Sequence, residues 1–262
     1  MKATLVFTSM LVLCLSSAQA QTGTIRYTAE AEIIWAGVDR ASDLIIQLKS
    51  GVVEKINLAG KRVGRYKFDQ VPTLIDPLDG AQAFFYQRKF GKYGTLSSDL
   101  AFATLVDLEP SLAVTPWLAA PMLHELWIVD AGDFTLKKTS SRCSAIAWEV
   151  AMPAIVSHNA EDLIYMKEYQ NYVFLLDRSA GIHVFNSLGK FLKTIGEKGI
   201  SYFGFIGEEI YYTKGGQLIL TDLYSGEVRT MALLGSSQFY LLVDELLYAV
   251  AGKEIQIIHF KP

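Results

Sequence analysis

The sequence predicts an all-β fold, a β-propeller of about six four-stranded blades closed by an N-terminal strand. Three observations predict this class. Strong helix signals are almost absent, β-rich runs come in pairs joined by turns that contain Gly or Asp, and the pairs recur at a regular spacing along the chain. Rings of five or seven blades, and a β-sandwich with repeat-like hairpins, are the alternatives.

Residues 1–20 have the pattern of a cleaved signal peptide. Lys2 precedes an apolar run, residues 5–15, that is too short to span a bilayer, and the small residues Ala18 and Ala20 end the segment. We expect cleavage after Ala20, so that residues 21–262 form a single propeller domain.

The chain has two cysteines, and the expected cleavage removes Cys14. A lipoprotein anchored at Cys14 is the rival interpretation, but residues 11–13 lack the small residue that lipidation normally needs. Cys143 then has no disulfide partner within the chain. It lies in an apolar, strand-like run, so we expect a buried structural thiol.

The paired runs recur six times, each as a β-rich run, a turn and a second β-rich run, which is the pattern of a β-hairpin. The copies start at positions 43, 82, 125, 172, 209 and 245. The spacings of 39, 43, 47, 37 and 36 residues, about 40 on average, are typical of four-stranded propeller blades. Helical repeats of similar length would need two amphipathic helices per unit, and we find none.

The first two copies are the weaker ones. In the first, residues 43–47 turn at Gly51 into residues 52–56, and in the second, residues 82–86 run into a longer loop, residues 88–94. The other four copies pair residues 125–130 with 134–137, 172–177 with 182–185, 209–213 with 217–220, and 245–249 with 254–258.

Two further strands fit between successive copies. Residues 190–195 are expected to close one blade, and residues 202–206 to open the next. The last blade has no outer strand after Phe260, and we expect residues 24–28 to fill that position. Joining both ends of the chain in one sheet removes an exposed sheet edge.

Three segments carry a resemblance to known propellers. Residues 174–192 resemble one unit of NHL-type repeats, and residues 220–228 resemble the turn of quinoprotein-type blades. Together with residues 126–138, they make the chain similar to small exported β-propeller proteins of Bacteroidetes-type bacteria. The resemblance covers most of residues 30–260 and implies the fold rather than a function, because one blade architecture serves many roles.

Composition and motifs give no sign of catalytic chemistry. The net charge of −3 gives no argument for nucleic acid, and the most apolar later stretch, residues 100–123, carries acids and prolines that a membrane-spanning helix does not accept. No nucleophile elbow or phosphate-binding loop is present. The histidines lack ligand-like spacing, so we expect satisfied structural residues, no metal site and no cofactor. They are His124, His158, His183 and His259.

Paired carboxylates are the remaining catalytic candidates. Propeller hydrolases gather such groups around the central channel, where the inner strands begin, and two of them within reach of one substrate could act as general acid and base. The turn positions of these residues favour ordinary turn chemistry instead. The pairs are Asp39 and Asp43, Asp76 and Asp79, Glu161 and Asp162, and Glu208 and Glu209.

Charge is distributed unevenly along the chain. Residues 49–92 hold nine basic and four acidic residues, whereas residues 93–136 hold six acidic residues and no Lys or Arg. Adjacent blades of opposite charge can steer and register a charged partner. The mixture of cations and aromatic rings in the second copy predicts a partner-binding surface there. Its residues are Arg88, Lys89, Phe90, Lys92 and Tyr93.

Two functions fit these observations. The first is a non-catalytic interaction or scaffold propeller of the bacterial cell envelope, in the periplasm, at the outer-membrane periphery or secreted, with another envelope protein as its partner. The alternative is a propeller hydrolase or lyase that acts on a carbohydrate or lactone through channel-facing carboxylates. The sequence leaves the oligomeric state open.

Overall fold

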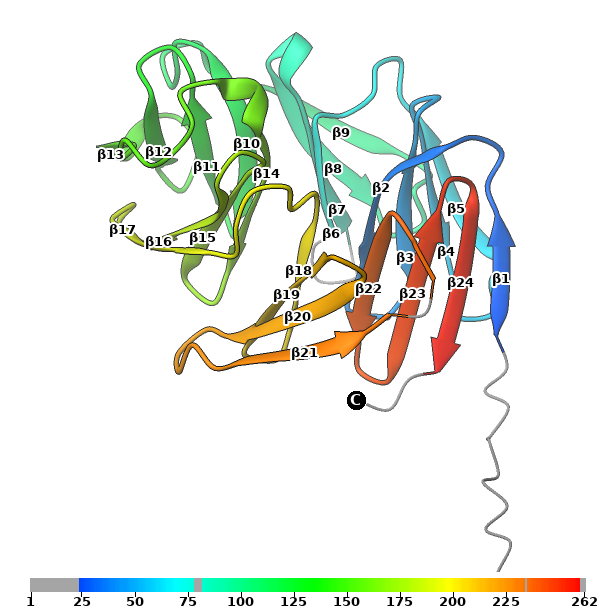
Figure 1. Cartoon of the computed structure of the whole chain (residues 1–262). Coiled ribbons are helices and arrows are strands. Elements are labelled where there is room, and N and C mark those ends of the chain that lie inside the picture. Colours follow the sequence, from blue (N-terminus) through cyan, green and yellow to red (C-terminus); the bar gives the residue numbers. More distant parts are fainter. Residues whose placement is uncertain (1–23, 78–81, 234, 260–262) are drawn as a thin grey trace, which may run out of the picture.

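The computed structural model describes residues 24–77, 82–233 and 235–259. In these residues 24 strands form six antiparallel sheets of four strands each. The sheets are arranged as blades around one axis (Figure 1). The predicted propeller of six four-stranded blades is therefore confirmed, while the expected signal peptide lies outside the described residues.

Each blade runs from an innermost strand at the axis to an outermost strand at the rim. The innermost strands are β2 (Ile33–Val38), β6 (Leu74–Pro77), β10 (Pro116–Met122), β14 (Leu163–Tyr169), β18 (Phe203–Ile206) and β22 (Phe239–Val243). The second strands are β3 (Leu44–Leu48), β7 (Gln82–Gln87), β11 (Glu125–Asp130), β15 (Tyr172–Asp177), β19 (Glu209–Lys214) and β23 (Leu246–Ala251). We number the blades 1 to 6 in this order.

The outer half of each blade follows the same plan. The third strands are β4 (Val52–Ile56), β8 (Lys92–Ser97), β12 (Thr135–Thr139), β16 (Gly181–Asn186), β20 (Gln217–Asp222) and β24 (Glu254–His259). The outermost strands are β5 (Arg62–Lys67), β9 (Ala103–Asp107), β13 (Ile146–Ala151), β17 (Phe191–Ile195), β21 (Val228–Ala232) and, in blade 6, β1 (Ile25–Thr28). Two short 3-10 helices, η1 (Arg88–Phe90) and η2 (Ala160–Asp162), lie in the connections.

The hairpin copies of the sequence are the second and third strands of the blades. Blade 2 differs from the expectation in one respect, because the predicted loop of residues 88–94 is shorter. Gly91 has a left-handed conformation with φ of 57°, which lets the chain reverse directly after η1. Lys92 already pairs with Gln87, so β8 begins inside the predicted loop.

The ring is closed by β1, which pairs antiparallel with β24. Ile25 lies opposite Ile257, and Figure 1 shows the blue N-terminal strand beside the red C-terminal one. The expectation that residues 24–28 complete the last blade is therefore confirmed. Closure removes the unpaired outer edge that β24 would otherwise present to solvent.

A buried carboxylate reinforces this closure. Glu54 on β4 of blade 1 is fully buried and accepts a hydrogen bond from the Tyr27 hydroxyl on β1 at 2.8 Å. Arg62 on β5 contacts the other oxygen of Glu54 at 2.9 Å. Burial, followed by the contact with Glu54, raises the pKa of Tyr27 to about 12, so its hydroxyl stays a donor at neutral pH.

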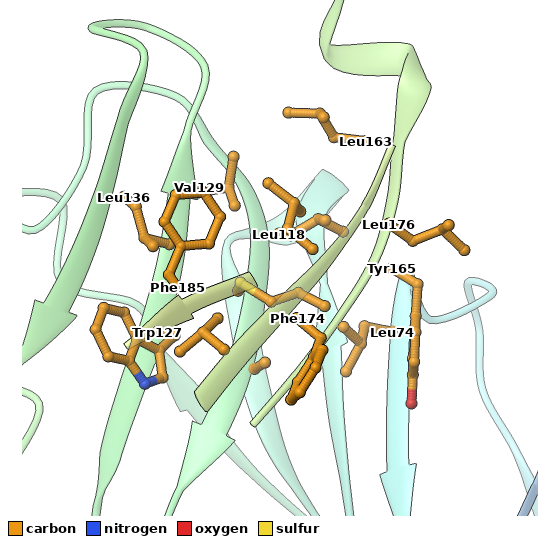
Figure 2. Packing of buried hydrophobic residues seen from close by; sticks show 14 of the residues in the cluster. Leu74, Leu118, Trp127, Val129, Leu136, Leu163, Tyr165, Phe174, Leu176 and Phe185 are labelled. Atoms are coloured by element: carbon orange, nitrogen blue, oxygen red, sulfur yellow. The ribbon is translucent and has the colours of Figure 1, made fainter. Parts of the chain in front are cut away.

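The apolar core lies between facing blades. The largest cluster joins blades 2 to 5, and Figure 2 shows Trp127 and Val129 of blade 3 in one layer with Phe174 and Phe185 of blade 4. A second cluster joins blade 6 to blade 1. Phe174 also meets Phe205 of blade 5 edge to face, with ring centroids 4.7 Å apart. Each sheet is thus covered on both faces, which explains the continuous apolar runs of the middle strands.

The strand order gives the ring two different faces. We call the face at which the innermost strands begin the inlet face; it also carries the turns between second and third strands. The outlet face is the one at which the innermost strands end; it carries the turns between first and second strands and between third and fourth strands. Every loop residue is thereby assigned to one of two sides of the molecule.

The closure contact can be tested by Tyr27→Phe, which removes one hydrogen bond to the buried charge of Glu54. We expect the free energy of unfolding to fall by about 1.5–3 kcal/mol, as for other hydrogen bonds to charged groups. Urea denaturation measures it. Thr28→Val is the control, because Thr28 on the same strand donates to exposed Glu254 at 3.0 Å and its loss should cost less than about 0.5 kcal/mol. Equal effects of the two substitutions would contradict a special role for Glu54.

Candidate functional site

A cavity of about 390 Å³ lies at the inlet face, where the beginnings of five innermost strands converge. Blades 1, 2, 4, 5 and 6 contribute to it. The polar and aromatic side chains that line it include Trp35, Gln47, Thr73, Tyr165, Arg178 and Tyr202. Convergence of chain segments from five blades makes this cavity an axial feature of the ring.

Trp35 on β2 has an unusual environment. A Cβ atom on Gly37 would lie 2.3 Å from the Trp35 ring, so the ring occupies space that only a glycine leaves free. The indole Nε1–H is buried, and within the described part of the chain it has no hydrogen-bond partner. A buried donor left unpaired costs about 1–3 kcal/mol, so Trp35, a residue of the cavity wall, carries an unmet donor.

Two tyrosine hydroxyls belong to the same wall. Burial, assisted by the nearby carboxylate of Asp76 and by Tyr211, raises the pKa of Tyr165 well above its ordinary value. Burial and the neighbouring tyrosines Tyr211 and Tyr165 do the same for Tyr202. Both hydroxyls therefore stay protonated and neutral at physiological pH and act as hydrogen-bond donors or acceptors.

An ion pair crosses the channel below the cavity. Lys167, two residues further along β14 than Tyr165, contacts Asp76 on β6, which joins blade 4 to blade 2 although blade 3 lies between them. Burial raises the pKa of Asp76, and the contact with Lys167 opposes this effect. The channel axis is thus bridged by charged side chains rather than left open.

The candidate carboxylate pairs of the sequence do not gather at the inlet face. Asp39 and Asp43 lie at the outlet face, where both contact the buried Lys55, with Nζ to oxygen distances of 2.8 and 3.4 Å. Asp39 also accepts from the backbone N–H groups of Ala41 and Asp43, which is the turn chemistry that was favoured.

The other pairs are also separated from one another. Glu208 and Glu209 lie at the outlet face, where Glu209 pairs with Arg229 at 2.6 Å. Glu161 and Asp162 lie in η2 at the inlet face. Asp76 is inside the channel, and Asp79 lies outside the described residues. Each described pair therefore has its own surroundings, and they share no common centre.

Two further aspartates hold the links between blades, and sequence reasoning missed them. Asp130 ends β11 and accepts from the backbone N–H groups of Val114 and Thr115, which lead into β10. Asp177 ends β15 and accepts from Ser157 N–H in the link into β14. The signal was present in the sequence, because both acids end the first apolar run of a hairpin copy.

The histidines differ in their surroundings. His183 on β16 is fully buried, with Nδ1 2.9 Å from the Thr194 hydroxyl and Nε2 3.2 Å from Asp177. The other three histidines are exposed, and one of them, His158, stacks on Phe134 with ring centroids 4.0 Å apart. The exposed residues are His124, His158 and His259.

Cys143 also differs from the expectation. It lies in the turn between β12 and β13 in a left-handed conformation, with φ of 52°, and it is half-buried rather than placed in a strand core. Among the residues that the structure describes, no group of three His, Cys, Asp or Glu side chains could hold a metal ion. The same residues contain no helix with the length and apolar character needed to cross a bilayer.

A second hollow lies where blade 2 meets blade 1 at the inlet face. This blade-2 groove has a volume of about 230 Å³ and is lined by Tyr66, Phe68, Phe90, Lys92 and Leu105, among others. Phe90 is 46% exposed and Leu105 is 54% exposed, although both are large apolar side chains. The groove thus combines apolar walls with a lysine at its rim.

The five predicted partner-binding residues do not all face the same surface. Some lie at the blade-2 groove, and the others face blade 3. Phe90 and Lys92 line the blade-2 groove, and Lys89 is exposed beside them. Arg88 instead lies over the Trp117 ring of blade 3, with its guanidinium carbon 3.5 Å from the ring centroid. Tyr93 is half-buried, and burial together with nearby Cys143 of blade 3 raises its pKa to about 12.

The basic segment is partly neutralised within the protein. Lys55 pairs with Asp39, and Lys92 pairs with Asp107 at 3.3 Å. Arg62 and Arg65 both pair with Glu30, at 3.0 and 2.8 Å. The strong positive field that the sequence suggests for blades 1 and 2 is therefore reduced by partners contributed from loops and strands nearby.

Comparisons with known proteins define the fold. No protein-family model and no curated protein matches the sequence. The structure is similar to that of streptogramin B lyase, with a TM-score of 0.53 and 14% identity over 88% of this chain and 80% of that one. It thus shares its fold with bacterial β-propeller proteins.

Two larger proteins contain a similar ring. One is the extracellular domain of a one-component system of B. thetaiotaomicron, with a TM-score of 0.57 and 11% identity over 87% of this chain. The other is PorZ, a surface component of the type-IX secretion system of Porphyromonas gingivalis, with a TM-score of 0.55 and 9% identity over 88% of this chain. The chain spans 33% and 32% of their lengths. At such identities the likeness shows a shared fold.

The burial of His183 makes stability depend on pH. Burial, opposed by Asp177, lowers the pKa of His183 below its ordinary value of 6.5, so on acidification the unfolded chain takes up a proton before the folded one. The contribution of His183 is therefore present above pH 6.5 and is lost as the pH falls through and below that value.

Urea denaturation at two pH values checks this dependence. Between pH ~7.5 and ~5.5 the wild type should lose more stability than His183→Gln, while exposed His158→Gln should follow the wild type. Parallel losses for the wild type and His183→Gln would show that His183 titrates alike in the folded and unfolded chains.

Proposed function

We propose that this protein is a non-catalytic propeller of the bacterial cell envelope that binds another protein through the blade-2 groove. The single observation that carries the proposal is the joint exposure of Phe90 and Leu105 around one hollow. Exposed apolar side chains scattered singly are normal on a protein surface, but a hollow lined by several of them is typical of contact sites.

The groove offers a partner both apolar and charged contacts. Tyr66 and Phe68 form its inner wall and are themselves packed edge to face, with centroids 4.8 Å apart. Lys67, Lys89 and Lys92 lie at or beside its rim, together with the exposed acid Asp69. A partner segment with an apolar or aromatic anchor and a flanking acid fits this chemistry, since buried anchors supply affinity and rim charges supply orientation.

The surroundings of the carboxylates favour binding over acid–base catalysis. Glycoside hydrolysis by two carboxylates needs them about 5–10 Å apart on either side of one bond. In the described part of the chain, Asp39 and Asp43 are both held by Lys55, and Glu209 is held by Arg229, so these carboxylates are engaged by cations within the protein. The observation that favours the alternative, a propeller hydrolase or lyase, is Asp76, whose carboxylate lies in the channel next to Lys167.

The envelope location rests on the expected leader and on the kind of protein that shares the fold. A signal peptide at residues 1–20 would export the chain, and cleavage after Ala20 would leave the ring intact because β1 begins at Ile25. PorZ is a bacterial surface component, and its ring resembles this one. The NHL-like and Bacteroidetes-type character of the blades belongs to the same proposal.

Site-specific photocrosslinking in the source cells tests the groove directly. A photoreactive amino acid in place of Lys89 should capture one envelope protein, because the side chain at this position is exposed beside the groove. The same amino acid in place of Lys190 is the matched control, since Lys190 is an exposed lysine in the β16–β17 turn on the outlet face. In the protein with the photoreactive amino acid at position 89, Phe90→Ser should abolish capture. Leu188→Ser in the same protein should leave capture unchanged, because Leu188 is 53% exposed on the outlet face.

Three results would overturn this proposal. Capture from position 190 as efficient as from position 89 would show that the groove is not the binding surface. Capture that survives Phe90→Ser would show that the apolar anchor has no role. Recovery of only uncrosslinked protein from both positions would show that this face binds no protein partner.

A further inference from the structure

We propose that the axial cavity of the inlet face is a binding site for small carboxylates with a flat or cyclic body, such as aromatic acids and sugar acids. This site is separate from the blade-2 groove, so the inference does not rest on the proposed protein partner. The volume of about 390 Å³ falls within the range of small-molecule sites, roughly 300–1,000 Å³. The charge and the hydrogen-bond donors of the cavity wall favour an acid.

The charge of the wall favours an anion. Arg178, in the turn between β15 and β16, lines the cavity and is exposed at its rim. None of the described lining residues is acidic, and within the described part of the chain no ion pair engages the Arg178 guanidinium. The guanidinium group is planar and can donate two parallel hydrogen bonds to the two oxygens of a carboxylate. Among the described residues, Arg178 is free to do so at the rim of the cavity.

The neutral polar groups of the wall are rich in donors. The Trp35 Nε1–H is buried without a partner in the described chain, and the Tyr165 hydroxyl is protonated at neutral pH, whereas the Tyr202 hydroxyl is engaged by Tyr211. Below the cavity, Asp76 is engaged by Lys167 and offers no free negative charge. Acceptor-rich ligands are therefore favoured, and cations meet no unpaired acid in the described wall.

The remaining wall is formed by rings. Trp35, Tyr165 and Phe239 bring aromatic surface from three different blades to the same hollow. Flat aromatic bodies and the apolar faces of sugar rings both pack against such side chains. Aromatic acids and sugar acids therefore share the feature that this cavity would recognise, a ring that carries a carboxylate. The ligands used in the test distinguish the two classes.

Ligand-observed NMR titration of the purified protein tests this site. Benzoate and galacturonate represent the two kinds of acid, and benzyl alcohol and galactose are their uncharged counterparts. At least one acid should bind about tenfold or more tightly than its counterpart, because a charge-assisted hydrogen-bond pair contributes at least that factor. The acid that shows the difference identifies the kind of ligand body.

Variants assign the binding to the cavity. Arg178→Gln should remove the preference for the acid, whereas Arg142→Gln, at an exposed arginine of the β12–β13 turn on the outlet face, should preserve it. Trp35→Phe keeps an aromatic ring but removes the N–H, and it should lower the affinity for the acid severalfold. Circular dichroism checks that each variant is folded. Equal binding of acids and neutral counterparts, no binding of either acid, or a preference that survives Arg178→Gln would overturn the proposal.

Discussion

The whole ring depends on the pairing of one four-residue strand with a strand from the other end of the chain. β1 lies against β24 with Ile25 opposite Ile257 and Thr28 opposite Glu254. Without this pairing, blade 6 would have three strands and an open edge. Fully buried Glu54 adds a charge to the closure, because it accepts from Tyr27 of blade 6 and contacts Arg62 of blade 1. Sheet pairing and a buried ion network therefore act at the same place.

Ring closure also determines where the two hollows lie. Because the innermost strands begin at one face, the first residues of five of them meet around the axis and form the cavity. Lys167 and Asp76 bridge the channel below it, and Gly37 leaves the space that the Trp35 ring fills. The turns between second and third strands share this face, so Arg178 reaches the axial cavity and Phe90 reaches the blade-2 groove. Two hollows of different chemistry thus lie on one side of the molecule.

The blades could be predicted from the sequence because a hairpin is a local feature, whose two runs and turn lie within about 15 residues of each other. The axial site could not, because Trp35, Tyr165 and Arg178 come from segments without a common spacing and meet only in the closed ring. The predicted blade-2 residues do not all lie together. Phe90 and Lys92 share the groove, but Arg88 turns to a ring of the next blade. Charge counts overstated the positive field because ion pairing depends on tertiary contacts.

Disulfide trapping across the closure tests whether β1 pairs with β24 in this register. Arg26 lies opposite Gln256, so Arg26→Cys with Gln256→Cys, in a chain with Cys14 and Cys143 replaced by Ser, should form an intramolecular disulfide. The bond should raise the urea midpoint, because it closes a loop of most of the chain. Arg26→Cys with Glu254→Cys shifts the pair by two residues and should form the bond poorly. Equal disulfide yields for both pairs, or no disulfide for the first, would contradict a ring closed by β1 in this register.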